Sequence, residues 1–166
     1  FIRAMFAGEA INLSEDRPVL HCRLRTPDSR QNETYQKLTN FVSDVRANQN
    51  IKSIVNLGIG GSDLGPAIAT AGLAGFHDGP AVHYVGNVDP HALYDILAQC
   101  DPRSTLFIMT SKTFTTSETL ANAGLAKGWL KQNGVAPEAA MVAVTTYQER
   151  AVDWGIDPAR IFDFDE

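Results

Sequence analysis

The sequence has few cysteines, no apolar run long enough to cross a membrane and no basic leader. Cys22 and Cys100 lie far apart, without the spacing of a CxxC motif or a zinc site, and a chain of 166 residues does not need a disulfide. We therefore expect two free, buried thiols in a reducing compartment, which favours the cytoplasm. Residues 1–10 lack the positive start and apolar centre of a secretory signal.

Positive charge is also scarce, since 14 Lys and Arg against 19 Asp and Glu give a formal net charge of −5. This balance argues against nucleic acid and anionic membranes as partners, because binding to them needs clustered Lys and Arg. An anionic small ligand would have to be bound by local donors in loops. Metal-ligand spacing is absent too, and we expect no metal site from the four histidines, His21, His77, His83 and His91.

Hydrophobic periodicity divides the chain near residue 50. Residues 1–50 are predicted to form a helical arm with helices at 14–25 and 33–48. Ser14 is expected to cap the first of these helices, and Pro18 to lie in its first turn. From residue 51 to 166, short apolar runs alternate with amphipathic stretches, which predicts one α/β domain.

The apolar runs predict strands at 53–59, 82–86, 105–110, 141–145 and 161–164. Four helices are expected: one that ends near residue 73, one at 90–99, one at 116–132 and a short one around Arg150. Asp89 is placed to cap the second of these, and Gly134 to end the third. Along 116–132, the leucines predicted to face the core are Leu120, Leu125 and Leu130. Strands alternating with helices predict a parallel sheet covered on both faces.

The first predicted strand runs into GIGGSDLGP at 58–66, here called the glycine loop. Glycines let a backbone approach a ligand closely, and the next helix offers unpaired N–H groups, so the loop suits a phosphate or a polar sugar. A dinucleotide fingerprint would need glycine where Asp63 stands, and a nucleoside-triphosphate loop would need Lys and Ser or Thr at Pro66 and Ala67. The remaining alternative is a tight turn with Ser62 as a helix cap.

The third predicted strand is followed by TSKTFTTSET at 110–119, here called the hydroxyl loop. Its hydroxyl donors are Ser111, Thr113, Thr115, Thr116 and Ser117. Lys112 adds a positive charge, and a helix N-terminus follows, which together suit a phosphate dianion. The structural alternative is a capping box of Thr115 and Glu118. A glutamate bonded to the backbone in this way would be a poor catalytic base.

NLGIGGSDLGP followed about fifty residues later by TSKTFTTSETLANA resembles the paired phosphate-site motifs of the phosphoglucose isomerase family. The flanking segments FAGEAINLSEDRPVLHCRLR, YVGNVDP and GIDPARIFDF are similar to that family as well. The resemblance covers nearly the whole chain. One small departure is Ser117, where relatives often carry glutamine.

The resemblance implies a doubly wound α/β fold, a three-layer sandwich of the SIS type, and conversion of glucose 6-phosphate to fructose 6-phosphate. It implies that the phosphate is bound by Ser111, Lys112, Thr113 and Thr116, with Thr115 beside them, and that Gly61 and Ser62 line the sugar. The family opens the sugar ring by acid/base catalysis, moves a proton through an enediol with a glutamate base, and needs no metal or organic cofactor. It forms homodimers in which one subunit lends the other a histidine.

The resemblance also predicts what the chain does not contain. The family's Gly-Gly-Arg-Tyr-Ser motif, its glutamate base and its histidines would all lie beyond Glu166. We therefore expect no catalytic residue in this chain and no isomerase activity from it alone. An open alternative is a non-catalytic, sugar-phosphate-binding regulatory module of the same fold. A protein whose surface, rather than its pocket, binds other proteins is a second alternative, but no large exposed apolar stretch supports it.

Overall fold

The computed structural model describes residues 1–14, 16–25 and 33–164. The chain divides into two compact units, Phe1–Phe41 and Val42–Asp165. The helix α2 (Glu33–Ala47) crosses from one unit to the other and agrees with the helix predicted at 33–48. Among the described residues, no helix combines the length and the apolar character that a membrane span requires.

The first unit holds α1 (Ile2–Ala7) and the short 3-10 helix η1 (His21–Arg25). The helix predicted at 14–25 is wrong in its first part. Asn12 and Arg17 exchange two backbone hydrogen bonds as an antiparallel bridge, and Ser14 Oγ donates to Asn12 Oδ1 at 2.8 Å instead of capping a helix. Local side-chain bonds of this kind compete with helix formation, and the residue before Pro18 is biased toward extended backbone.

The second unit contains the strands β1 (Ser53–Gly58), β2 (Ala81–Val85), β3 (Thr105–Thr110), β4 (Met141–Val144) and β5 (Ile161–Phe162). Its longer helices are α3 (Gly61–Gly72), α4 (Pro90–Leu97), α5 (Ser117–Gln132) and α7 (Gln148–Trp154). Its short helical turns are η3 (Ala74–Phe76), η4 (Pro102–Ser104), α6 (Pro137–Ala140) and η5 (Pro158–Arg160). All five strands lie within two residues of their predicted ends. Asp89 caps α4 by accepting from the His91 N–H, and Gly134 follows α5 with φ 72°, as predicted.

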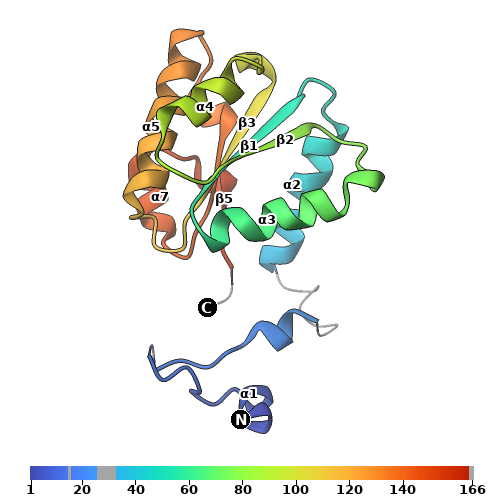
Figure 1. Cartoon of the computed structure of the whole chain (residues 1–166), viewed down its shortest axis with the longest axis vertical. Coiled ribbons are helices and arrows are strands. Elements are labelled where there is room, and N and C mark those ends of the chain that lie inside the picture. The colour runs from blue at the N-terminus through green and yellow to red at the C-terminus, as the bar shows by residue number, and fades with distance from the viewer. Residues whose placement is uncertain (15, 26–32, 165–166) are drawn as a thin grey trace. The chain divides into compact units, whose positions relative to one another are not determined.

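The strands form one parallel sheet in the order β2-β1-β3-β4-β5. The chain first moves from β1 to β2 at one edge, then crosses back and continues to β5 at the other edge. Because such crossovers are right-handed, the reversal places helices on opposite faces. Figure 1 shows α3 on one side of the sheet and α4, α5 and α7 on the other. The predicted doubly wound α/β fold is confirmed.

The core lies between the sheet and the helices α4 and α5, which cover one of its faces. Phe107, at the centre of β3, is fully buried and meets Trp129 of α5 edge-on, with ring centroids 6.0 Å apart. Residues that are almost fully buried with it include Val55, Leu57, Val85, Leu93, Leu97, Met109, Ala123, Ala126, Leu130, Met141 and Ala143.

Two sequence-based expectations about burial need correction. Leu130 is buried as predicted, and Leu120, although half-buried, packs against the core as predicted, but Leu125 is exposed. The buried face of α5 consists of Thr119, Asn122, Ala123, Ala126 and Leu130. These residues follow the helical spacing of three and four, whereas a spacing of five rotates successive side chains off one face. Cys22 and Cys100 are free thiols as predicted, but both are half-buried rather than buried.

Candidate functional site

The glycine loop and the hydroxyl loop begin at the same edge of the sheet. β1 and β3 are parallel neighbours, and Gly58 at the end of β1 pairs with Thr110 at the end of β3. This is also where the strand order reverses, because β1 connects to β2 on one side while β3 lies on the other. Ligands of open α/β sheets bind in the crevice at such a point. The two loops therefore lie side by side at one rim, here called the carboxyl-end rim.

The glycine loop makes a tight turn that leads directly into α3. Gly60 has φ 60° and ψ −120°, and the Ser62 N–H donates to the Ile59 carbonyl at 3.2 Å. These values are those of the first central residue of a type II′ turn, which requires glycine. Gly60, not Ser62, is the N-cap of α3, and no side chain caps the helix. The expected turn is therefore present, but the alternative that Ser62 caps the helix is wrong.

Asn56, near the end of β1, joins the two loops. Its Nδ2 donates to the Ser62 carbonyl at 3.0 Å, and its Oδ1 accepts from Thr110 Oγ1 at 2.9 Å. Its side chain is buried, so both bonds are shielded from water. Our sequence reasoning missed this residue. The available signal was a single amide side chain inside an otherwise apolar strand.

The hydroxyls of the second loop bond to one another in pairs. Ser111 Oγ, which is buried, lies 3.1 Å from Thr116 Oγ1, and Thr113 Oγ1 lies 2.7 Å from Thr115 Oγ1. Lys112 is exposed beside them. The loop is anchored by Phe114, which is buried despite a left-handed φ of 53°. A bulky residue adopts that conformation only where the surroundings enforce it.

The predicted capping box is not formed. Thr116, not Thr115, occupies the N-cap position of α5, and its side chain makes no capping bond. The Glu118 carboxylate accepts from its own backbone N–H and from Ser117 Oγ at 3.0 Å. These two bonds lower the pKa of Glu118 from its ordinary value, the backbone bond contributing more. The carboxylate is therefore a weak proton acceptor, in agreement with the expectation that it is a poor base.

The backbone of the hydroxyl loop contains N–H groups that lack an acceptor in the described part of the chain. Within the described residues, no acceptor bonds the amides of Thr113, Thr115 or Thr116. The carbonyls of Lys112 and Thr113, in contrast, accept bonds from the segment that follows β4. Free amides, hydroxyls and an ammonium at the start of a sixteen-residue helix form a typical anion site.

A third loop, which follows β2, completes the rim. Gly86 packs so closely against the Asp63 carboxylate that a Cβ there would overlap it. The Asn122 Nδ2 of α5 donates to the Asn87 carbonyl at 2.7 Å. Among the described residues, the buried side-chain atoms without a partner are Asp63 Oδ1, Thr119 Oγ1 and Asn122 Oδ1. Buried polar atoms normally have partners, so these three show that the surroundings of the rim are polar and contain unused hydrogen-bonding capacity.

The predicted site residues are brought together on the two adjacent loops. Gly61 and Ser62 lie in the first turn of α3, exposed and half-buried respectively. The other five lie on the hydroxyl loop at the end of β3: Ser111, Lys112, Thr113, Thr115 and Thr116. Asn56 bonds to both loops, and Asp63 lies in the glycine loop against Gly86; neither was among the predicted site residues.

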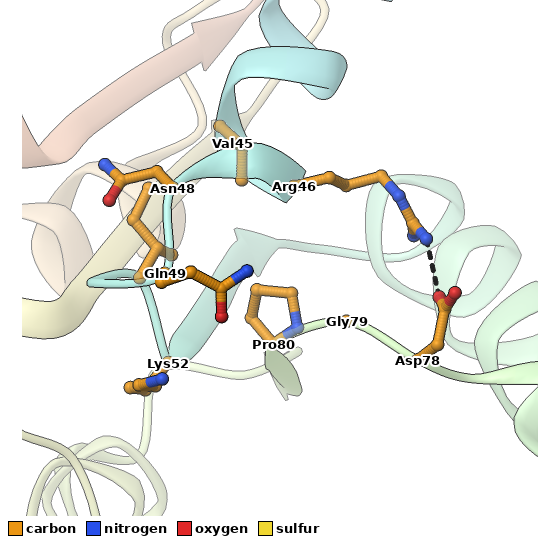
Figure 2. A pocket seen from close by; sticks show the side chains of 9 residues that line it. Val45, Arg46, Asn48, Gln49, Lys52, Asp78, Gly79 and Pro80 are labelled. Atoms are coloured by element: carbon orange, nitrogen blue, oxygen red, sulfur yellow. Dashed lines mark hydrogen bonds and ion pairs between the residues drawn. The ribbon is translucent and has the colours of Figure 1, made fainter.

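Two cavities lie at the opposite end of the strands. One, of about 170 Å³, is lined by the end of α2 and by the residues that precede β1 and β2, including Lys52 and Pro80. Figure 2 shows Arg46 reaching from α2 to the Asp78 carboxylate, 2.6 Å away. The Arg46 hydrogen bond and charge lower the pKa of Asp78. The second cavity, of about 310 Å³, shares this ion pair. Neither contains a predicted site residue, so we assign the site to the carboxyl-end rim.

The described residues hold no group of three or more His, Cys, Asp and Glu side chains placed to bind a metal ion. His91 Nδ1 lies 3.1 Å from Asp89 Oδ1 on the surface, where it belongs to the cap of α4. This carboxylate accepts from the His91 N–H and ring, which lowers the pKa of Asp89.

Comparison with known proteins gives a consistent result. A family model described as phosphoglucose isomerase matches residues 1–166. The glucose-6-phosphate isomerase of Cereibacter sphaeroides is 43% identical over 180 residues, covering 98% of this chain and 34% of the relative. That of Jannaschia is 44% identical with the same coverage. A crystal structure of glucose-6-phosphate isomerase from Chlamydia trachomatis has a TM-score of 0.83 and 28% identity, covering 98% of this chain and 35% of that one. The chain thus spans about a third of the length of the curated relatives it matches.

Proposed function

The chain belongs to the phosphoglucose isomerase family, and we propose that it forms the phosphate-binding part of a glucose-6-phosphate isomerase. The activity of the whole protein is the reversible conversion of glucose 6-phosphate to fructose 6-phosphate. The relatives that carry this name match nearly all of the chain. The observation that carries the proposal is the pairing of the glycine and hydroxyl loops at the carboxyl-end rim.

In this proposal the phosphate dianion is bound by the hydroxyl loop. Its amides and hydroxyls at Ser111, Thr113, Thr115 and Thr116 donate hydrogen bonds, and Lys112 supplies a full positive charge. The start of α5 adds the positive end of the helix dipole. This arrangement supports binding despite the net charge of −5, because the donors act at contact distance while the overall field is screened by salt.

The glycine loop lines the sugar in the same proposal. Gly61 is exposed at the start of α3, and the Ser62 hydroxyl takes no part in capping that helix. Asn56 holds the Ser62 carbonyl and Thr110 in a fixed relation, which supports a constant distance between the sugar side and the phosphate side. A site held in this way binds with less loss of conformational entropy.

The chemistry of the reaction requires a base that moves a proton between neighbouring carbons of the opened sugar through an enediol. We propose that this base is not in the present chain, which spans about a third of its relatives. Glu118, the carboxylate of the hydroxyl loop, has a lowered pKa and is engaged by its own amide and by Ser117. No metal or organic cofactor is part of the proposal.

We also propose a compartment and an assembly for the whole enzyme. Two free thiols agree with a reducing compartment, and we place the enzyme in the cytoplasm. By family resemblance, we propose a homodimer in which each subunit contributes to its partner's site. We also propose that the chain is divided into a helical arm at 1–50 and a phosphate-binding α/β domain at 51–166, as predicted from the sequence.

The phosphate site is tested by replacing two of its hydroxyls. Thr113→Val combined with Thr116→Val keeps side-chain volume but removes two donors, and hydrogen bonds to a charged group contribute about 1.5–3 kcal/mol each. We expect the dissociation constant for inorganic phosphate and for fructose 6-phosphate to rise about a hundredfold or more. Titration followed by amide NMR shifts at 111–117 measures it.

The matched control for this double variant is Ser104→Ala, which removes a hydroxyl from η4, just before the amino end of β3. Its affinity for phosphate should equal that of the unmodified chain. Unchanged binding in the threonine double variant, with the fold intact by circular dichroism, would refute the assignment of the hydroxyl loop.

A further inference from the structure

The Lys112 carbonyl of the hydroxyl loop is bound by the segment between β4 and α7. The Lys112 carbonyl accepts from Thr145 Oγ1 at 3.0 Å, from the Thr146 N–H at 3.2 Å and from Thr146 Oγ1 at 3.0 Å. Thr145 is fully buried, which shields the first of these bonds from water. Since a trans peptide holds its C=O and N–H on opposite sides, the Thr113 N–H is directed away from this segment.

The next carbonyl of the loop, that of Thr113, is bound by a single charged group. Arg150 Nη1 donates to it at 2.6 Å. The guanidinium carbon also lies 4.2 Å from the centre of the Tyr147 ring, in the geometry of a cation–π contact. The planar guanidinium is therefore held on two sides, by the ring and by the carbonyl. An ammonium group would not reproduce this geometry, because it is neither planar nor able to stack.

The helix that carries Arg150 is itself fixed at its far end. Lys127 of α5 donates from Nζ to the carbonyl of Trp154, the last residue of α7, at 2.9 Å, and lies 4.2 Å from the centre of the Trp154 indole. Ala151, beside Arg150, is fully buried against the core. The donor that reaches Thr113 thus projects from a short helix anchored to the domain rather than from a free segment.

The bond to the Thr113 carbonyl restrains the peptide that precedes Phe114, the strained residue of the loop. The peptide between Thr113 and Phe114 precedes a left-handed φ of 53°, a conformation that costs a bulky residue free energy. Its N–H makes only a long bond of 3.3 Å to the Ser111 carbonyl. A charge-assisted bond of 2.6 Å to its carbonyl is the stronger of the two restraints on this peptide.

We propose that Arg150 is a positioning residue for the phosphate site. It holds the Thr113 carbonyl, keeps Phe114 in its left-handed conformation, and so directs the free amides of Thr113 and Thr115 toward the anion. Its charge also adds to that of Lys112 in a chain whose net charge is −5. The inference rests on the proposed function, since it assigns Arg150 to the phosphate site described above.

The test compares Arg150→Ala and Arg150→Lys with Arg103→Ala, which removes the same charge from the exposed turn η4 at the other end of the sheet. Inorganic phosphate is titrated into each chain and followed by amide NMR shifts. We expect affinity to fall about tenfold in Arg150→Ala, because a bond from a charged donor is lost. Arg150→Lys should keep the charge but recover only part of the affinity, and Arg103→Ala should bind as the unmodified chain does.

A second readout separates positioning from simple attraction. Guanidinium ion at millimolar concentration should restore part of the affinity of Arg150→Ala, while the same concentration of sodium chloride should not. Unchanged affinity in Arg150→Ala, or an equal loss in Arg103→Ala, overturns the proposal.

The ligand-free chains distinguish a failure of this proposal from a failure of the proposed function. If the unmodified chain does not bind phosphate at all, the proposed function is wrong, and the role of Arg150 is judged from the loop itself. Altered amide shifts and faster hydrogen exchange at 112–117 in Arg150→Ala support its positioning role. A loop unchanged by the substitution overturns that role.

Discussion

Gly60 is a residue whose local backbone geometry shapes the candidate site. Its φ of 60° and ψ of −120° turn the chain from β1 into α3 and place Gly61 and Ser62 at the carboxyl-end rim. A Cβ added to Gly60 would meet no atom within 4 Å. Any cost of a side chain there is therefore a cost of backbone conformation and not of crowding.

Gly60→Ala should destabilise the domain by about 1–3 kcal/mol, the usual cost of holding a non-glycine residue in a sparsely populated region. Urea unfolding monitored by circular dichroism measures the change. Gly65→Ala is the matched control, because Gly65 lies inside α3 with open space around it and no positive φ. It should raise stability by about 0.5–1 kcal/mol, since alanine favours a helix interior. Equal effects of the two substitutions would contradict the role assigned to the turn.

At the scale of elements, β3 and α5 form the support of the proposed phosphate site. The hydroxyl loop connects them directly, so its position depends on how the helix packs on the strand. That packing is made by the buried face of α5 and by the edge-on contact of Trp129 with Phe107. The small residues Ala123 and Ala126 let the helix lie close to the sheet.

Phe107→Ala should therefore lower the free energy of unfolding by about 3–5 kcal/mol, as large-to-small changes in a packed core do. The loss should appear in urea or thermal unfolding, and phosphate affinity should fall with it as the loop loses its support. Phe76→Ala serves as the comparison, because the Phe76 side chain is 85% exposed. That change is expected to stay within about 0.5 kcal/mol. A loss at Phe107 no larger than at Phe76 would show that the contact with Trp129 is unimportant.

At the scale of the whole molecule, we propose that the chain binds the sugar phosphate but does not contain the catalytic base. It spans about a third of its glucose-6-phosphate isomerase relatives and, in this proposal, contributes the phosphate side of their site. In this proposal, recognition of a dianion depends on the few donors of the hydroxyl loop and the start of α5, because the net charge of −5 gives no long-range attraction.

The chain alone should therefore show no measurable conversion of fructose 6-phosphate to glucose 6-phosphate in an assay coupled to glucose 6-phosphate oxidation. Its contact with the sugar phosphate should still be visible as NMR shifts in the hydroxyl loop. Host isomerase must be excluded, for which protein from an isomerase-deficient strain is the control. Turnover well above that background would mean that the catalytic base lies within these 166 residues.

The strands, most helices and the two loops could be predicted from the sequence, because periodicity and turn residues act over short distances. The same reasoning failed for the helix at 14–25 and for Leu125. In the first case, the mutual bonds of Asn12 and Arg17 and the bond from Ser14 replaced the helix. In the second, a spacing of five was taken for one face of a helix.

The sequence by itself determined the α/β class, the order of the strands along the chain and the hydroxyls and glycines of the candidate site. Only the tertiary structure decided which groups hold them in place. Asn56 meets Thr110 across 54 residues of sequence, and Arg150 meets Thr113 across 37. Contacts of such separation depend on the strand order and on side-chain direction, which local patterns do not encode.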